Sequence, residues 1–259
     1  FISIFNQMFG KNNPVILLNM IDSLSGSKIK GKLYRIAFKR LYCSVNNKDL
    51  IDVYHQMYGL PKERFFIQED TIDDWGVRII NQKDTDVKDE GYIFTGGNSY
   101  RDWNLYLQVV RNLPQYKFVG VAARPSFPKC ELPPNLKMYF DVPYQKFIDL
   151  LKRCCIGYVP INVQSQGGQI VAYQLALYHK AVVTTDSYGI KSVMENGVNG
   201  ILVKMSDKES SIAAIRTLMS NESLREQYQK ALYRKVMALT PEHFCNQLFR
   251  FAVEKNIMI

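Results

Sequence analysis

The sequence lacks the patterns that mark membrane-spanning, metal-binding and serine-nucleophile proteins. No apolar run is as long as a membrane-spanning helix requires. The histidines, His55, His179 and His243, stand at no spacing typical of a metal site. Neither a G-x-S-x-G motif nor a Walker-type lysine loop occurs. These absences favour a function that needs no resident metal ion and no serine nucleophile.

Cysteine is also scarce, and its positions exclude a disulfide framework. The chain of 259 residues has five cysteines, at Cys43, Cys130, Cys154, Cys155 and Cys245. Their odd number and irregular spacing fit reduced thiols, most of them buried, in a cytoplasmic protein. Because 47% of the residues are hydrophobic, the chain can still build a large core without covalent cross-links.

Acidic residues are fewer than basic ones: 24 Asp and Glu against 33 Lys and Arg give a net charge of +9. Chains with a positive net charge of this size commonly bind nucleic acids, anionic membranes or phosphorylated substrates. No basic run is interleaved with stacking aromatic residues, which argues against nucleic acid. Residues 27–41 mix basic and apolar side chains and predict a basic amphipathic helix. This helix either lies on anionic lipid or is an ordinary solvated face.

Alternating strand-like and helix-like segments predict an α/β fold with parallel sheets. Residues 1–78 read as the closing part of an N-terminal Rossmann-like domain, and the chain is expected to begin inside that domain. Residues 79–91 are polar and predict a linker, in which the D-x-D spelling at 84–86 follows no strand and is interpreted as chance. Residues 92–240 predict a second Rossmann-like domain, and residues 241–259 a terminal helix.

The most informative stretch is residues 166–203. A glycine pair, Gly167 and Gly168, opens a segment in which apolar residues recur at helical spacing, which predicts an amphipathic helix. The β-branched run 181–185 and the segment 201–203 then predict two buried strands. A glycine-led helix start next to parallel strands is where α/β proteins hold phosphate groups.

This stretch resembles the donor-binding segment of GT-B glycosyltransferases, in particular the retaining enzymes of family 4. The residues in register with the family pattern are Gly168, Lys180, Val182, Val183, Asp186, Gly189, Val193, Gly197, Asn199, Gly200, Leu202 and Val203. Both glutamates of the pattern are replaced, by Gln166 and Gln174. The resemblance covers residues 92–240 well and 14–75 loosely.

The resemblance implies a donor site at the carboxyl ends of several strands. In the turn after the first strand of the second domain, Gly96, Gly97 and Arg101 would hold the donor diphosphate. The loop of Val142 and Tyr144 would hold the nucleobase, although core packing is an equal alternative for Tyr144. The remaining residues expected to bind the donor are Arg124, Gly167, Gly168, Gln169, Ile170 and Gln174.

Three residues are candidates for the chemistry itself. Arg101 would stabilise the leaving diphosphate, or is simply a surface residue at a helix start. Gln166 would contact the transferred sugar, with Gln164 or Gln169 as alternatives in its place. Asp22, where the family often has a histidine, would contact the acceptor or act as a base, or is an Asx turn or helix cap.

The predicted function is transfer of a sugar from a nucleotide-diphosphate sugar to a hydroxyl of a polysaccharide or lipid-linked glycan, with no cofactor. By resemblance the reaction would be retaining and independent of metal. The enzyme would be cytoplasmic, with peripheral contact at the inner face of a membrane, and the terminal helix would cross back to the first domain. A different class remains open: a weak or inactive GT-B protein that binds a sugar nucleotide as a partner subunit. A GT-B epimerase ranks last because no acidic and histidine cluster is apparent.

Overall fold

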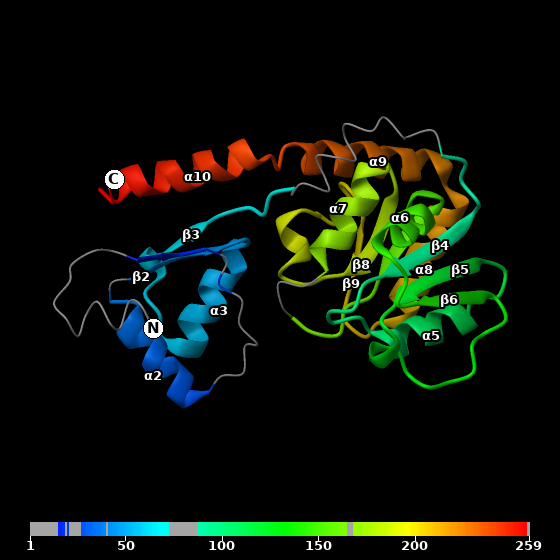
Figure 1. Ribbon diagram of the computed structural model, residues 1–259, viewed down its shortest axis with the longest axis horizontal. Helices are drawn as coiled ribbons and strands as arrows, with labels where there is room; N and C mark the ends of the chain where they lie inside the picture. The colour runs from blue at the N-terminus through cyan, green and yellow to red at the C-terminus, as the bar shows by residue number, and fades with distance from the viewer. Residues whose placement is uncertain are drawn as a thin grey trace. The chain divides into compact units, whose positions relative to one another are not determined.

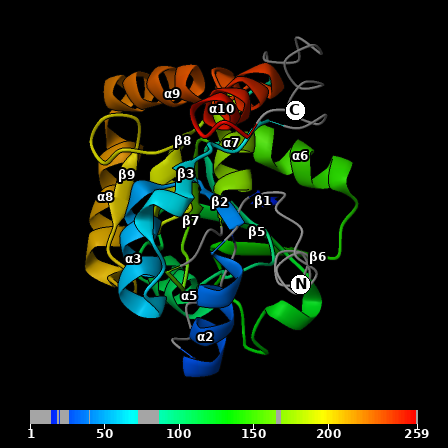
Figure 2. The ribbon, with the colours of Figure 1, turned by 90° about the vertical axis from the view of Figure 1, so that its left-hand side faces the viewer.

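A computed structural model describes residues 15–18, 20, 27–39, 41–72, 87–164 and 168–257. By its internal contacts the chain divides into two compact units. The first consists of Phe1–Thr71 with Leu239–Ile259, and the second of Ile72–Ala238. Figures 1 and 2 show that both units are built from strands and helices that alternate along the chain. The α/β fold class predicted from the sequence is therefore confirmed.

In its described part, the first unit has a three-stranded parallel sheet in the order β1-β2-β3. Its elements are β1 (Val15–Leu17), α2 (Lys28–Ala37), β2 (Leu41–Val45), α3 (Lys48–Tyr58), a 3-10 turn (Lys62–Arg64), β3 (Phe65–Ile67) and α10 (Pro241–Glu254). Helix α3 begins where the Asn47 side chain accepts a hydrogen bond from the Asp49 amide, at 2.7 Å. It ends at Gly59, whose φ of 64° is left-handed and suits a glycine.

Polar contacts fix helix α10 to the end of β3 within the first unit. The Gln247 side-chain oxygen accepts from the Gln68 amide group at 2.9 Å and from the Glu69 backbone N–H at 3.1 Å. The Phe66 and Phe251 rings stack with their centroids 3.8 Å apart. The two hydrogen bonds join residues that are 179 and 178 positions apart in the sequence.

The second unit contains, in its described part, a six-stranded parallel sheet in the order β6-β5-β4-β7-β8-β9. The strands are β4 (Tyr92–Gly96), β5 (Lys117–Ala122), β6 (Leu136–Phe140), β7 (Ile156–Val159), β8 (Ala181–Thr185) and β9 (Ile201–Val203). The α-helices are α5 (Trp103–Arg111), α6 (Tyr144–Lys152), α7 (Gln169–Leu177), α8 (Lys208–Ser220) and α9 (Glu222–Met237). The strand order turns back on itself between β4 and β7, which is the point where open α/β sheets bind ligands.

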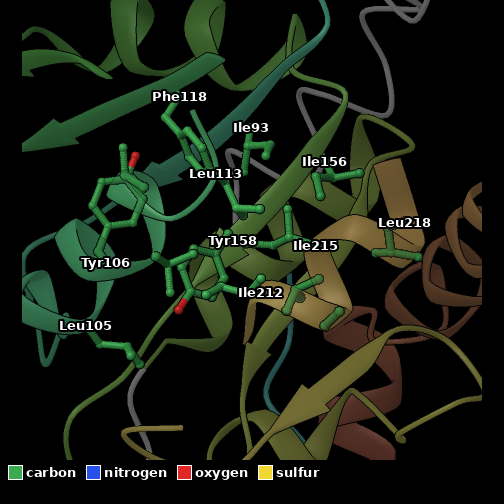
Figure 3. Packing of buried hydrophobic residues seen from close by; sticks show 14 of the residues in the cluster. Ile93, Leu105, Tyr106, Leu113, Phe118, Ile156, Tyr158, Ile212, Ile215 and Leu218 are labelled. Carbon is green, nitrogen blue, oxygen red and sulfur yellow. The ribbon is translucent and has the colours of Figure 1, made fainter. Parts of the chain in front are cut away.

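Helices cover both faces of this sheet. Tyr158 of β7 belongs to the apolar cluster that also contains Tyr106 of α5 and Ile215 of α8, as Figure 3 shows. The preceding residue, Gly157, lies against Leu175 of α7. Because successive residues of a strand point to opposite faces, α7 lies on the face opposite to α5 and α8.

Helix α7 differs from the sequence-based expectation. It was predicted to be amphipathic, but every residue from 171 to 177 is buried. The reason is tertiary: α7 contacts α6, α9, β7 and β8, so it has almost no solvent face. None of the helices in the described ranges combines the length and the apolar character that crossing a membrane requires.

Candidate functional site

The turn after β4 is anchored to the segment after β7. Tyr100 accepts from the Asn162 amide at 3.0 Å, and the Asp102 amide donates to Pro160 at 3.1 Å. Within this turn Gly97 has a φ of 101°, a conformation that side chains rarely adopt. Tyr100 is also left-handed, with a φ of 58°. The turn is therefore held beside the carboxyl end of β7, at the point where the strand order reverses.

Arg101 is buried inside this turn. Its side chain is 6% exposed, and its Nε donates to the Gly96 carbonyl oxygen at 2.6 Å. Burial lowers the pKa of the guanidinium to about 10, so the group stays protonated at neutral pH. The surface position considered for Arg101 from the sequence is therefore wrong.

The guanidinium lies between two glycines from different elements. A Cβ atom at Gly97 would be 2.8 Å from Nη2 of Arg101, and one at Gly168 would be 3.7 Å from Nη1. In the described ranges, no carboxylate pairs with this cation. A buried cation held only by carbonyl oxygens favours the binding of an anion beside it.

The amino end of helix α7 supplies a second feature that favours an anion. Its N-cap is Gly168, with a φ of 95° and no side-chain cap, and a Cβ there would collide with Ile161. Because the N-cap residue is a glycine, it has no side chain that could cap the first-turn N–H groups of α7. Arg101 and the positive end of the helix dipole face the same place, which is the arrangement that binds phosphate.

A cavity of about 350 Å³ adjoins this anion site at the carboxyl edge of the sheet. It is lined by Gly97, Asn98, Val121, Ala122, Ala123, Asp141, Val142, Tyr144, Phe147 and Gln174. Side-chain oxygens hold its wall: Oδ1 of Asn98 accepts from the Ala123 backbone N–H at 2.6 Å, and Oδ1 of Asp141 accepts from the Arg124 backbone N–H at 3.2 Å. Its volume falls within the range of small-molecule sites.

Aromatic rings form the side of the cavity next to α6. Tyr144 is 51% exposed, so it is not a core residue. Its ring lies 6.4 Å from that of Phe147 at an interplanar angle of 15°. The Phe147 ring in turn occupies the space that a side chain at Gly96 would need. Gln174 is 4% exposed, and its Nε2 donates to the Tyr144 hydroxyl at 3.3 Å.

The structure brings together most of the residues expected to bind a donor. Gly97, Val142, Tyr144 and Gln174 line the cavity, and Gly96, Arg101, Gly168, Gln169 and Ile170 lie at or next to the anion site. Arg124 does not line the cavity but follows Ala123, which does, and its guanidinium lies 4.4 Å from the centre of the Phe140 ring. Asp22, Gln166, Gly167 and the D-x-D spelling at 84–86 are outside the described residues.

Six residues that line the cavity were not predicted as site residues: Asn98, Val121, Ala122, Ala123, Asp141 and Phe147. Asn98 is in the glycine-rich turn, and Phe147 follows Tyr144 by one helical turn. Their closeness to predicted site residues could therefore have identified both from the sequence. Asp141 carried no signal of its role, because its φ of 50° and its bond to Arg124 arise only when β5 and β6 pair. In the described ranges, no group of three or more His, Cys, Asp or Glu side chains is arranged to hold a metal ion.

Comparison with known proteins agrees with this architecture. The family model for glycosyl transferases group 1 matches residues 126–235. The structure of Anabaena HepE with UDP superposes with a TM-score of 0.76 at 13% identity, covering 97% of this chain and 76% of that one. TarM of S. aureus gives 0.75 at 14%, covering 95% and 52%. A glycosyltransferase from Rickettsia africae gives 0.74 at 13%, covering 98% and 73%. No curated protein sequence matches the chain.

The fold is thus the GT-B type, with a parallel α/β sheet in each unit, as the sequence predicted. The glycosyl transferases group 1 model matches a segment within the second unit, and the chain is a glycosyltransferase. The resemblance stated from residues 166–203 is therefore confirmed.

Proposed function

We propose that the second unit binds a nucleotide-diphosphate sugar and that the enzyme transfers the sugar to a hydroxyl group of a glycan or lipid-linked acceptor. The observation that carries the proposal is the buried Arg101 cation, which faces the amino end of α7 beside a cavity of nucleoside size. A diphosphate between Arg101 and α7 would neutralise the positive charge of Arg101, which no carboxylate among the described residues balances.

In this reaction the bond between the sugar's anomeric carbon and the diphosphate oxygen breaks. The acceptor oxygen forms the new bond to that carbon and gives up its proton, and the diphosphate leaves with added negative charge. Arg101 and the first-turn amides of α7 would stabilise that charge as hydrogen-bond donors that are already in position. These groups would allow the step without a metal ion, and retention of configuration is proposed from the family resemblance.

Structural neighbours support this donor class. One HepE structure contains UDP-glucose, and one TarM structure contains UDP with alpha-GlcNAc-glycerol. Gln166 as a sugar contact and Asp22 as an acceptor contact or base stay predictions. The cytoplasmic location, with peripheral association at the inner face of a membrane, is likewise part of the proposal.

Binding of UDP, GDP and ADP measured by calorimetry tests the donor site. Removing the charge with Arg101→Gln should weaken the best binder by about ten- to a hundredfold, which corresponds to losing charge-assisted hydrogen bonds of about 1.5–3 kcal/mol. Arg111→Gln, at an exposed position in α5, is the matched control and should bind like wild type. Equal affinity of wild type and Arg101→Gln would refute the site.

One observation favours the partner-subunit alternative. Gln174 is a neutral amide where the family has a glutamate, and it bonds to Tyr144. A protein that binds a nucleotide without turning over its sugar, across a screen of glycan and lipid-linked acceptors, would be this second kind. If the protein forms a glycosylated product from any nucleotide sugar, it is an active enzyme and the partner-subunit alternative is refuted.

Peripheral contact with an anionic membrane is proposed from helix α2. Ile29, Leu33 and Ile36 lie on one stripe of this helix and are 74%, 52% and 44% exposed. Lys28 and Lys32 are exposed next to that stripe. An apolar stripe flanked by cations matches the surface of an anionic bilayer.

Co-sedimentation with phosphatidylglycerol vesicles tests this contact. Lys28→Glu/Lys32→Glu and Ile29→Ser/Leu33→Ser should each reduce the bound fraction several-fold. Lys117→Glu/Lys204→Glu, which changes charge equally at exposed positions of the second unit, should not. The membrane contact is refuted if all three variants bind alike.

A further inference from the structure

We propose that Gln174 acts on the donor through Tyr144, as a positioning residue that fixes one wall of the nucleoside site. The inference rests on the proposed function and concerns how this chain replaces the glutamate of the family pattern. Its basis is a contact between two helices at the cavity: Nε2 of Gln174 in α7 donates to the Tyr144 hydroxyl at the start of α6, at 3.3 Å.

Exposure separates the roles of the two side chains. Gln174 is 4% exposed, so it presents little surface to a ligand, although one part of it reaches the cavity. Tyr144 is 51% exposed and lines the same cavity. The surface that a nucleoside meets is therefore mainly that of the tyrosine, with the amide behind it.

The nitrogen of the Gln174 side chain, rather than its oxygen, faces the Tyr144 hydroxyl, and this placement decides the direction of the hydrogen bond. An amide NH₂ group can only donate, so the Tyr144 oxygen accepts, and the phenol proton is directed away from Gln174. A carboxylate at position 174 can only accept, so it would draw that proton toward itself. Glutamine and glutamate therefore orient the Tyr144 hydroxyl in opposite senses, and they are not equivalent here.

The ring of Tyr144 is fixed by further packing. It lies nearly parallel to Phe147, and Phe147 meets the buried Phe94 edge-on at 5.4 Å and 77°. Phe147 can approach the turn after β4 because residue 96 is a glycine. With its plane set by Phe147 and its hydroxyl by Gln174, Tyr144 is a preorganised flat surface suited to an aromatic base or a ribose face.

A double-mutant cycle on ligand affinity tests this coupling. The variants are Tyr144→Phe, Gln174→Met and the double variant. The ligands are inorganic pyrophosphate and the nucleoside diphosphate that binds best among UDP, GDP and ADP. We expect each single variant to weaken the nucleoside diphosphate about three- to tenfold and the double variant to lose no more than either one. Pyrophosphate affinity should stay constant, because Arg101 and α7 bind it.

Gln174→Glu separates positioning from direct contact. A direct ribose contact predicts that glutamate tightens nucleoside diphosphate binding, whereas positioning through Tyr144 predicts that it weakens binding. In the Tyr144→Phe background the glutamate should then have little effect. Gln174→Asn, which keeps the amide but shortens the side chain, is a second variant in case Gln174→Met unfolds, and melting temperatures without ligand identify such unfolding.

Additive losses in the cycle, tighter binding by Gln174→Glu, or an equal loss for pyrophosphate would each overturn the positioning role while leaving the donor site in place. Failure of the wild-type protein to bind any nucleoside diphosphate would overturn the donor site and the positioning role together. The two failures are thus distinguishable.

Discussion

The sheets of the two units differ in one respect that decides where a ligand binds. In the first unit the described strands follow chain order, β1-β2-β3, whereas in the second the order reverses between β4 and β7. At a reversal the connections leave toward opposite faces of the sheet, so the carboxyl ends of the two central strands stay uncovered. The anion site and the cavity both lie at this place.

The sheets also differ in burial. All residues of β4, β7 and β8 are buried, whereas no residue of β1 is fully buried. An apolar cavity of about 340 Å³ is lined in part by Ile16 and Leu18, at β1, and by Phe249 of α10. Parallel strands are usually covered on both faces. The second unit therefore has the more complete core, and we expect it to be the more stable.

The largest expected effect is in the core of the second unit. Ile215→Ala removes a fully buried side chain of α8 and should lower the free energy of unfolding by about 2–5 kcal/mol. Leu17→Ala, in β1, removes a side chain that is 43% exposed and should cost well under half of that. Urea unfolding followed by circular dichroism measures both, and equal losses would contradict the comparison.

The next effect concerns the anion site. Gly168→Ala introduces a Cβ at a φ of 95° against Ile161, and should lower the free energy of unfolding by about 1–3 kcal/mol. It should also weaken nucleotide binding, because the start of α7 must shift. Gly197→Ala is the matched control: its φ is 77°, but a Cβ there meets nothing within 4 Å. Nucleotide affinity unchanged in Gly168→Ala would argue against α7 as the phosphate contact.

A smaller effect is expected where α10 is fixed to the first unit. Gln247→Ala removes the acceptor of Gln68 and of the Glu69 amide, which should cost about 1–2 kcal/mol in the first unit. Hydrogen exchange should rise in α10 and near β3, while nucleotide affinity stays the same. Gln227→Ala, at an exposed position of α9, should change neither measurement.

Alkylation of the buried cysteines measures the unfolding of each unit in the wild-type protein, without a mutation that changes its stability. Burial raises the pKa of Cys43 to about 12 and that of Cys155 to about 11, so neither should be alkylated in the folded protein at pH 8. The exposed Cys130 and Cys245 should react first. In rising urea, mass spectrometry should find Cys43, in the first unit, modified before Cys155 in the second. The reverse order would refute the predicted difference in stability.

Much of the site was predictable because its residues stand next to strand ends. The turn of Gly96, Gly97 and Arg101 directly follows a buried strand, and Gly168 directly precedes a helix. Parallel strands bring such positions to one edge whatever the details of packing. The roles of Asp141 and Phe147 were not predictable, because the first depends on the pairing of β5 with β6 and the second on the absence of a side chain at Gly96.

The sequence by itself determined the α/β class, the likeness to GT-B glycosyltransferases and the residues of the turns proposed to bind phosphate, because these depend on short-range periodicity and on glycine positions. Only the tertiary structure decided that residues 171–177 of α7 are all buried, that Arg101 is a buried cation between Gly97 and Gly168, and that Gln174 bonds to Tyr144. Burial and partner choice are set by which elements pack together, and packing joins residues whose separation along the chain carries no local signal.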